Sequence, residues 1–229
     1  MIFAESDLPW DNTWGNQRNT WVSALDIVTS NSWAGGATSP TEAMSRITDA
    51  LFKSGRFKYD ISKGAPFYLS PANNVLFSKC IEQLSGGPKS ATFVNCVDCA
   101  NFVVTFSNLV GSPIYASRMG RSFNTNQYCA IGQPAWTPPN WGWAFSFHEV
   151  AWTGACDDSD FIFDACLQVN GNGDPSTPPR TPIPCANMLF SDGNAGPPYV
   201  YRESLAAPGA NGYDKCKAMP AARTRRGIE

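Results

Sequence analysis

The chain has 229 residues, of which 43% are hydrophobic and only 16% are charged. This length is enough for one large domain with its own core, and the low charge excludes an intrinsically disordered chain. The formal net charge is −2, so the chain as a whole lacks the positive charge that nucleic-acid binding requires. Five basic residues lie within 215–226, and such a short basic tail is typical of a solvated chain end.

The sequence gives no sign of a membrane segment or of an export signal. No apolar stretch approaches the ~18 residues of a membrane-spanning helix. Residues 1–10 also lack the basic and apolar regions of a signal peptide. We therefore expect neither a membrane nor a nucleic acid as a partner.

The first half of the chain predicts two helices separated by a short extended piece. The first 42 residues are rich in Trp, Asn, Ser and Gly and match no family pattern. Apolar residues at helical spacing then predict a helix that Thr41 can cap and that ends at 53–55. An extended piece is expected at 57–60, and a second helix near 75–84.

The second half predicts one buried helix followed by strands. Residues 94–110 are mainly apolar and predict a long, mostly buried helix, with Gly111 and Pro113 as its stop signals. Strands are predicted at 113–119, 144–152 and 161–169. The 24-residue segment 120–143 is expected to be a functional loop, and the Pro- and Gly-rich segment 171–198 to be irregular covering structure. A helix followed by an antiparallel meander predicts an α+β fold.

One histidine and one acid lie on neighbouring predicted strands. His148 is the only histidine in the chain, and Asp164 belongs to the next strand. If the two strands form an antiparallel hairpin around Cys156, His148 pairs with Asp164, and Trp152 pairs with Asp160. A carboxylate in that position holds the imidazole tautomer and stabilises its charged form. A solvated histidine on the sheet is the alternative that this pair alone leaves open.

Two cysteines lie at the start of the predicted buried helix. Cys96 is placed where free amide groups and the helix dipole favour a thiolate, and a nearby histidine would make that thiolate a nucleophile. A buried structural cysteine is the alternative. Cys96 and Cys99 also form a CxxC pair, which leaves a thiol–disulfide function open. Zinc is not expected, because the chain has no second CxxC and only one histidine.

These residues resemble the core of the transglutaminase-like superfamily. The run Cys96-Val97-Asp98-Cys99-Ala100 matches the family's C-x-D-x-A pattern, in which the nucleophile comes first. Gly111-Ser112-Pro113, fifteen residues later, is similar to the G-I-P turn that ends the helix, with Ser in place of Ile. The segment 57–60 and the order of His148 and Asp164 also resemble the family. The resemblance covers about residues 43–170.

The resemblance implies a papain-like fold for a catalytic core at 43–170, with an extension before it (1–42) and one covering it (171–229). It implies Cys96 as nucleophile, His148 as general base and acid, and Asp164 as the residue that orients the imidazole. The reaction would be acyl transfer from protein or peptide amides through a thioester, without a cofactor. Transglutaminase, glutamine deamidase and cysteine protease activities all fit this scheme.

Further residues are candidates for the oxyanion hole and the substrate groove. The backbone N–H of Cys96 is the natural first oxyanion donor. By similarity to related enzymes, Trp33 or Gln83 is a candidate for the second. Three tryptophans of the long loop are candidates for the wall of an apolar acyl groove: Trp136, Trp141 and Trp143.

Two other functions remain open, namely a catalytically silent binding domain and a thiol–disulfide protein. A bacterial toxin or effector domain with a partner or inhibitor protein is consistent with the flanking segments. Apart from Cys96 and Cys99, six of the eight cysteines could form three disulfides. We predict at least one disulfide, made through Cys185 or Cys216, and a secreted or otherwise exported destination.

Overall fold

The computed structural model describes residues 18–60, 64–87, 90–133, 144–170, 182–193 and 200–229. The fold is α+β, as the order of elements predicts. The helices are α1 (Arg18–Val28), α2 (Pro40–Lys53), α3 (Phe77–Leu84), α4 (Cys96–Leu109) and α5 (Tyr201–Leu205), with a 3-10 turn at Tyr213–Lys215. The strands are β1 (Phe57–Tyr59), β2 (Thr92–Val94), β3 (Tyr115–Met119), β4 (Phe123–Asn124), β5 (Tyr128–Ala130), β6 (Ala144–Phe145), β7 (His148–Trp152), β8 (Phe161–Asn170), β9 (Pro182–Leu189) and β10 (Ala218–Thr224).

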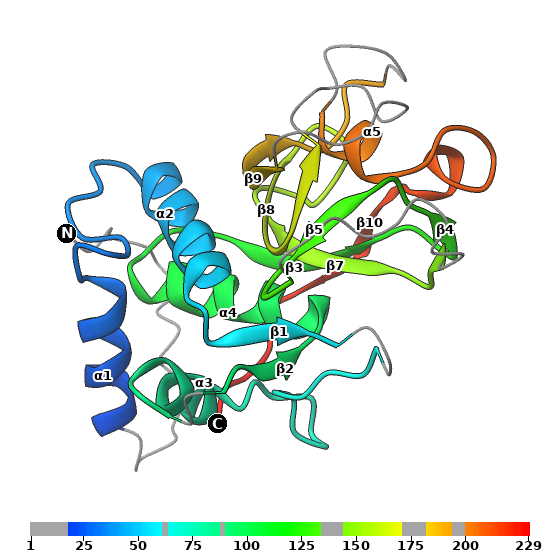
Figure 1. Ribbon diagram of the computed structural model, residues 1–229. Coiled ribbons are helices and arrows are strands. Elements are labelled where there is room, and N and C mark those ends of the chain that lie inside the picture. Colours follow the sequence, from blue (N-terminus) through cyan, green and yellow to red (C-terminus); the bar gives the residue numbers. More distant parts are fainter. Residues whose placement is uncertain (1–17, 61–63, 88–89, 134–143, 171–181, 194–199) are drawn as a thin grey trace.

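The main sheet has six strands in the order β10-β3-β7-β8-β5, and β9 also pairs with β8. All its pairings are antiparallel. Strands β1 and β2 form a separate parallel pair, and β4 pairs with β6. Because β9 and β10 come from the segment after residue 170, that segment supplies two strands of the sheet and is not only irregular covering structure (Figure 1).

Helix α4 is the centre of the molecule. Every one of its residues is buried, including the polar residues Asp98, Asn101, Thr105, Ser107 and Asn108. It packs against β7 and β8 of the sheet and against α2. Figure 1 shows it in green between α2 and the sheet. The position of Cys96, which begins this helix, is therefore set by the packing of α4 against these elements.

The predicted helices 41–53 and 75–84 are present, with small differences at their starts. The cap of α2 is Ser39 and not Thr41, because the Ser39 side chain accepts the N–H of Glu42 and a proline opens the helix. Helix α3 begins at Phe77 because Val75 is engaged in a parallel bridge with Ile228. The apolar residues near 21–28 belong to α1, which was not predicted.

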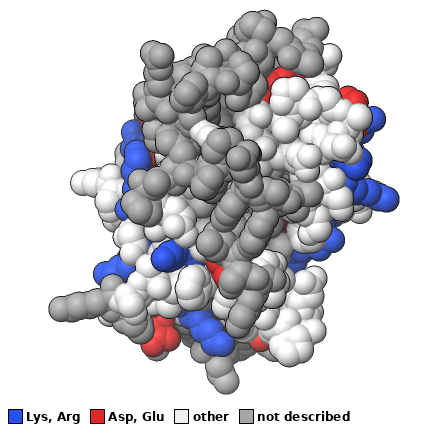
Figure 2. Space-filling model, turned by 45° about the vertical axis from the view of Figure 1, so that its right-hand side comes forward, with Lys and Arg blue, Asp and Glu red and all other residues white. Residues whose placement is uncertain are grey.

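Two other expectations need correction. The segment 120–143 is not simply a loop, because it contains β4 and β5, and β5 pairs with β8. The basic segment 215–226 is not a solvated tail, because it forms β10, and Arg226 is buried with only 6% of its side chain exposed. Figure 2 shows basic side chains at separate places on one face, most of them near its margins. No described helix is long and apolar enough to cross a membrane.

Candidate active site

The candidate nucleophile, Cys96, is the first residue of α4. Asn95 caps the helix: its side chain accepts the Asp98 N–H at 3.1 Å, and the Asp98 carboxylate accepts the Asn95 N–H at 3.0 Å. This capping box leaves the Cys96 N–H among the first amide groups of the helix, which have no intrahelical partner. The Cys96 side chain therefore lies at the positive end of a buried helix dipole.

Asp98 also anchors the loop that precedes α3. Its two carboxylate oxygens accept the N–H groups of Phe67 and Tyr68, each at 2.9 Å, and the Asn95 amide donates to Gly64 O at 2.8 Å. Burial raises the pKa of Asp98 to about 6, although its three backbone hydrogen bonds act in the opposite direction. The start of the nucleophile helix is thus fixed to a segment thirty residues earlier in the chain.

The candidate base and its acid are in direct contact. His148 Nε2 lies 2.9 Å from Asp164 Oδ2, and both side chains are buried. His148 opens β7 and Asp164 lies in β8, so two neighbouring strands hold the pair. The structure therefore brings together the two residues that the sequence pairs.

The register of this hairpin differs from the predicted one by two residues. Trp152 lies opposite Ile162 and not opposite Asp160. A shift of two residues keeps each side chain on its own face of the sheet. For this reason His148 and Asp164 remain on one face and meet diagonally, even though they are not directly paired.

Asp164 is fully occupied by donors. Its Oδ2 also accepts the Tyr201 hydroxyl at 2.7 Å, and its Oδ1 accepts the N–H groups of Cys166 at 2.7 Å and Leu167 at 3.2 Å. The last two bonds lie where the β8–β9 ladder is interrupted, between Asp164 and Gln168. The Asp164 carboxylate therefore accepts the N–H groups of Cys166 and Leu167 where the ladder is interrupted, and it also holds the imidazole of His148.

The bond to Asp164 through Nε2 leaves the other ring nitrogen of His148 available to the candidate nucleophile. With Nε2 bound to Asp164, Nδ1 has no hydrogen-bond partner of standard geometry. Burial alone lowers the pKa of His148, but Coulombic attraction and hydrogen bonding from Asp164 and then Cys96 outweigh it and raise the pKa to about 10. Cys96 makes the smaller contribution of the two, and no hydrogen bond of standard geometry joins its thiol to Nδ1. The charged imidazolium is thus the favoured form.

Aromatic rings surround the pair. Phe145 stacks on the imidazole, with centroids 5.2 Å apart and planes at 18°, and Tyr128 stacks on Phe145. Tyr59 is also buried, and burial, followed by Coulombic interaction with Cys96 and Cys166, raises the pKa of its phenol. These rings limit the access of water to the imidazole and the thiol.

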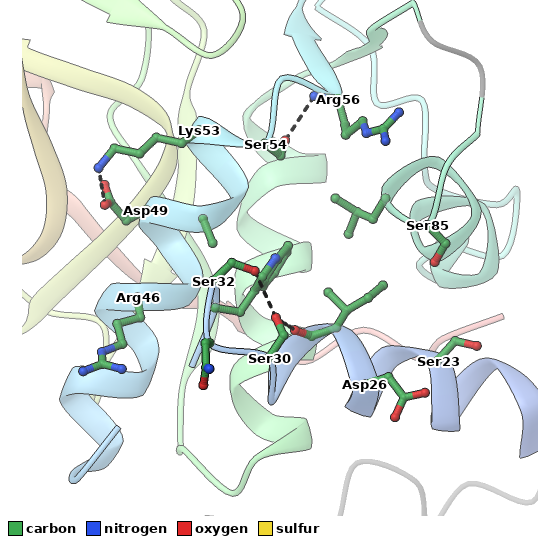
Figure 3. A pocket seen from close by; sticks show the side chains of 15 residues that line it. Ser23, Asp26, Ser30, Ser32, Arg46, Asp49, Lys53, Ser54, Arg56 and Ser85 are labelled. Atoms are coloured by element: carbon green, nitrogen blue, oxygen red, sulfur yellow. Dashed lines mark hydrogen bonds and ion pairs between the residues drawn. The ribbon is translucent and has the colours of Figure 1, made fainter. Parts of the chain in front are cut away.

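Trp33 lies far from the candidate nucleophile. Its ring packs against Phe106, with centroids 4.9 Å apart. Phe106 is ten residues after Cys96 in α4, which corresponds to about 15 Å along the helix axis. Trp33 lines a separate pocket of about 900 Å³ between α1, α2 and the end of α3 (Figure 3). The structure therefore does not bring this oxyanion candidate to Cys96.

Gln83 is also placed elsewhere. Its amide nitrogen lies 3.0 Å from Arg56 O and 3.3 Å from Ser90 O, and donates to both carbonyl groups. These bonds hold the segments that lead into β1 and β2, so this amide is used in the scaffold. The three groove candidates Trp136, Trp141 and Trp143 lie outside the described residues.

All eight cysteines lie in the described part of the chain, and all are free thiols. The disulfide expected through Cys185 or Cys216 is therefore wrong for this structure, and both of these thiols are buried. Within the described ranges, His, Cys, Asp and Glu side chains form no group of three or more that could hold a metal ion.

Sequence analysis missed two contributors to this site. Tyr201 comes from α5, in a segment without a recognisable pattern, and no spacing rule connects it to Asp164. Phe145 lies three residues before His148, and an aromatic residue so close to the only histidine was the one available signal.

Comparison of the chain with protein-family models, with curated proteins and with solved structures found no match.

Proposed function

We propose that the protein is a cysteine-dependent acyl-transfer enzyme that acts on protein or peptide amides through Cys96, His148 and Asp164. The observation that carries the proposal is the orientation of the imidazole: Nε2 is bound to Asp164, and Nδ1 is left for the thiol at the start of α4. A nucleophile, a base within its reach and a third group that orients the base form the constellation of nucleophilic catalysis. A buried helix packed on an antiparallel sheet also supports a papain-like arrangement.

The proposed reaction has two stages. The Cys96 thiolate attacks the amide carbonyl carbon, and the resulting oxyanion accepts a hydrogen bond from the Cys96 N–H. The His148 imidazolium then donates its proton to the leaving nitrogen, so that the C–N bond breaks and a thioester remains. In the second stage neutral His148 takes a proton from water or from a primary amine, which attacks the thioester and releases the thiolate.

The acceptor distinguishes three activities, and one experiment reads all of them. Purified protein is incubated with casein and a labelled primary amine, while incorporation of the label, release of ammonia and peptide cleavage are followed together. We expect at least one of these signals, and we expect Cys96→Ala and His148→Ala to abolish it. The chain has no second histidine that could accept the proton.

Cys99→Ala is the matched control, because Cys99 lies on the same helix one turn after Cys96 and is also buried. This variant should keep most of the activity. If Cys99 proved essential and His148 dispensable, the proposal would fail and a thiol–disulfide function would replace it.

A further inference from the structure

A buried ion pair lies directly beside the candidate site and has no part in the chemistry proposed above. Arg226 and Glu149 expose only 6% and 2% of their side chains. The guanidinium binds the carboxylate with two nitrogens, Nη1 at 2.5 Å from Oε1 and Nη2 at 3.2 Å from Oε2. Glu149 follows His148 in β7, so this pair is one residue away from the candidate base.

The same guanidinium also reaches the nucleophile helix. Arg226 Nη1 donates to Asn101 Oδ1 at 3.0 Å. The Asn101 amide in turn donates to Val97 O at 2.6 Å and to Glu149 Oε1 at 3.3 Å. Val97 is the neighbour of Cys96. Arg226 is therefore bonded, directly and through Asn101, to the residues adjacent to both the candidate nucleophile and the candidate base.

The segment around Arg226 is itself firmly attached. Gly227 O accepts the N–H of Val75 at 2.8 Å, and the Glu229 N–H donates to Val75 O at 2.8 Å. The Glu229 carboxylate accepts hydrogen bonds from Ser70 and Asn74. Figure 1 shows this red segment running from β10 past α4 to α3. The chain thus delivers Arg226 to a fixed point between α4 and β7.

A buried ion pair is weak evidence for added stability, because the cost of removing two charges from water offsets much of their attraction. What a bidentate guanidinium–carboxylate pair provides is direction, since its planar fork fits the carboxylate in one geometry. Cys96 and His148 lie on different elements, and no hydrogen bond of standard geometry joins the thiol to Nδ1, whereas Nε2 is bound to Asp164 at 2.9 Å. A bond network that fixes α4 against β7 therefore also fixes the position of the thiol relative to the imidazole.

We propose that Arg226 is a positioning residue of the active site, which holds α4 against β7 so that the Cys96 thiol meets Nδ1 of His148. This inference rests on the proposed function for its catalytic meaning. The alignment of the Cys96 and His148 side chains can be measured without any substrate, through the effect of Cys96 on the pKa of His148.

The test follows the single imidazole of the chain by NMR over a pH titration, in four backgrounds: unchanged protein, Cys96→Ala, Arg226→Gln and the double variant. In the unchanged protein, Cys96→Ala should lower the pKa of His148, because the thiolate helps to hold the proton. In the Arg226→Gln background the same Cys96→Ala change should have little effect on the pKa of His148. The coupling, defined as the change in that pKa caused by Cys96→Ala, should be smaller by about one pH unit than in the unchanged protein. The contribution of Asp164 should remain in both backgrounds.

Activity provides the second readout. Arg226→Gln should lower kcat roughly 10- to 100-fold with little change in KM, the size of effect expected from misplaced catalytic groups. Arg226→Lys, which keeps the charge but not the fork, should recover part of the loss. Arg225→Gln is the matched control, because Arg225 is the neighbouring arginine and its guanidinium donates to Ile114 O and lies over the Tyr115 ring.

The proposal is overturned if Cys96→Ala lowers the pKa of His148 as much in the Arg226→Gln background as it does in the unchanged protein. If Arg226→Gln fails to fold, the titration is made with Glu149→Gln/Arg226→Gln, which removes both charges of the buried pair. Arg118, the other ion-pair partner of Glu149, keeps 43% of its side chain exposed to water. Unchanged coupling in that variant also overturns the proposal. Absence of acyl-transfer activity together with the expected loss of coupling would refute the proposed function and retain the positioning role.

Discussion

At the scale of single residues, His148 controls how the candidate site responds to pH. Its pKa is raised from 6.5 to about 10, so the folded state binds a proton over a range in which the unfolded chain has released it. Stability from this group is complete below about pH 6.5 and is lost as the pH rises towards 10. The thiolate–imidazolium form is lost over the upper part of the same range, and activity should fall with it.

Asp164→Asn should move this behaviour to lower pH. Without the negative charge, burial lowers the pKa of His148 and only Cys96 acts against it. We expect the alkaline limb of kcat/KM to shift towards pH 6.5, some activity to remain, and the pH dependence of stability between 6.5 and 10 to flatten. Rate profiles and urea unfolding at several pH values measure both effects. An alkaline limb that stays in place would show that Asp164 does not set the charge of the imidazole.

The three central residues were predictable because each carries a local signal. Cys96 opens an apolar helix, and His148 is the only histidine. The pairing with Asp164 withstood an error of two residues in the register, since such an error does not change the face of a strand. Tyr201 was not predictable, because its bond to Asp164 depends on where the chain returns after β9.

At the scale of elements, the start of α4 depends on the Asp98 carboxylate. The pKa of this group is raised from 3.8 to about 6, so the folded state holds its proton more tightly than the unfolded chain does. Its contribution therefore makes the protein less stable as the pH rises from about 4 to 6. The carboxylate nevertheless accepts three backbone N–H groups, which a neutral amide cannot all satisfy.

Asp98→Asn should accordingly have two effects of different kinds. At pH 7 it should destabilise the protein by on the order of 1–3 kcal/mol, because buried N–H groups lose their acceptor. Between about pH 4 and 6 it should flatten the dependence of stability on pH. Urea unfolding of both proteins at pH 4, 5, 6 and 7 measures the two effects together. Equal stability at pH 7 would mean that the capping box and the loop anchor contribute little.

Helical periodicity located α2 and α4 to within two residues at most ends, because each has the burial pattern that its sequence requires. It missed α1, whose sequence has few signals beyond a short apolar run. The start of α3 was misplaced for a different reason. Val75 is withdrawn from the helix by a bridge to Ile228, and a contact across so much of the chain leaves no local trace.

At the scale of the whole molecule, the reactivity of the cysteine thiols reports on the packing of the core. Seven are buried and Cys129 is partly exposed, and burial raises the pKa of most of them, for example that of Cys156 to about 12. We expect all eight thiols to react with a disulfide reagent in denaturant without a reductant. Under native conditions only Cys129 and the proposed nucleophile Cys96 should react quickly. Fewer than eight free thiols in denaturant would restore the disulfide prediction.

The composition of the sheet is what sequence reasoning could least predict. Strand β9 joins β8, and β10 joins β3 from a hundred residues away. Periodicity identifies a strand but does not identify its partner, and the Pro- and Gly-rich segments indicated covering structure. The sheet, and with it the path that brings Arg226 to the site, depends on pairings between distant parts of the chain.

The interruption of the β8–β9 ladder has a consequence for how substitutions would be tolerated. Asp164 serves the imidazole and also two backbone groups that the interrupted ladder leaves unpaired. In a saturation library sorted once for cellular abundance and once for turnover, variants with a substitution at Asp164 should be depleted in both sorts. Variants with a substitution at Cys96, whose side chain holds no such backbone group, should be depleted only in the sort for turnover. Invariance at these two positions in any lineage would thus have different origins, folding together with chemistry at Asp164 and chemistry alone at Cys96.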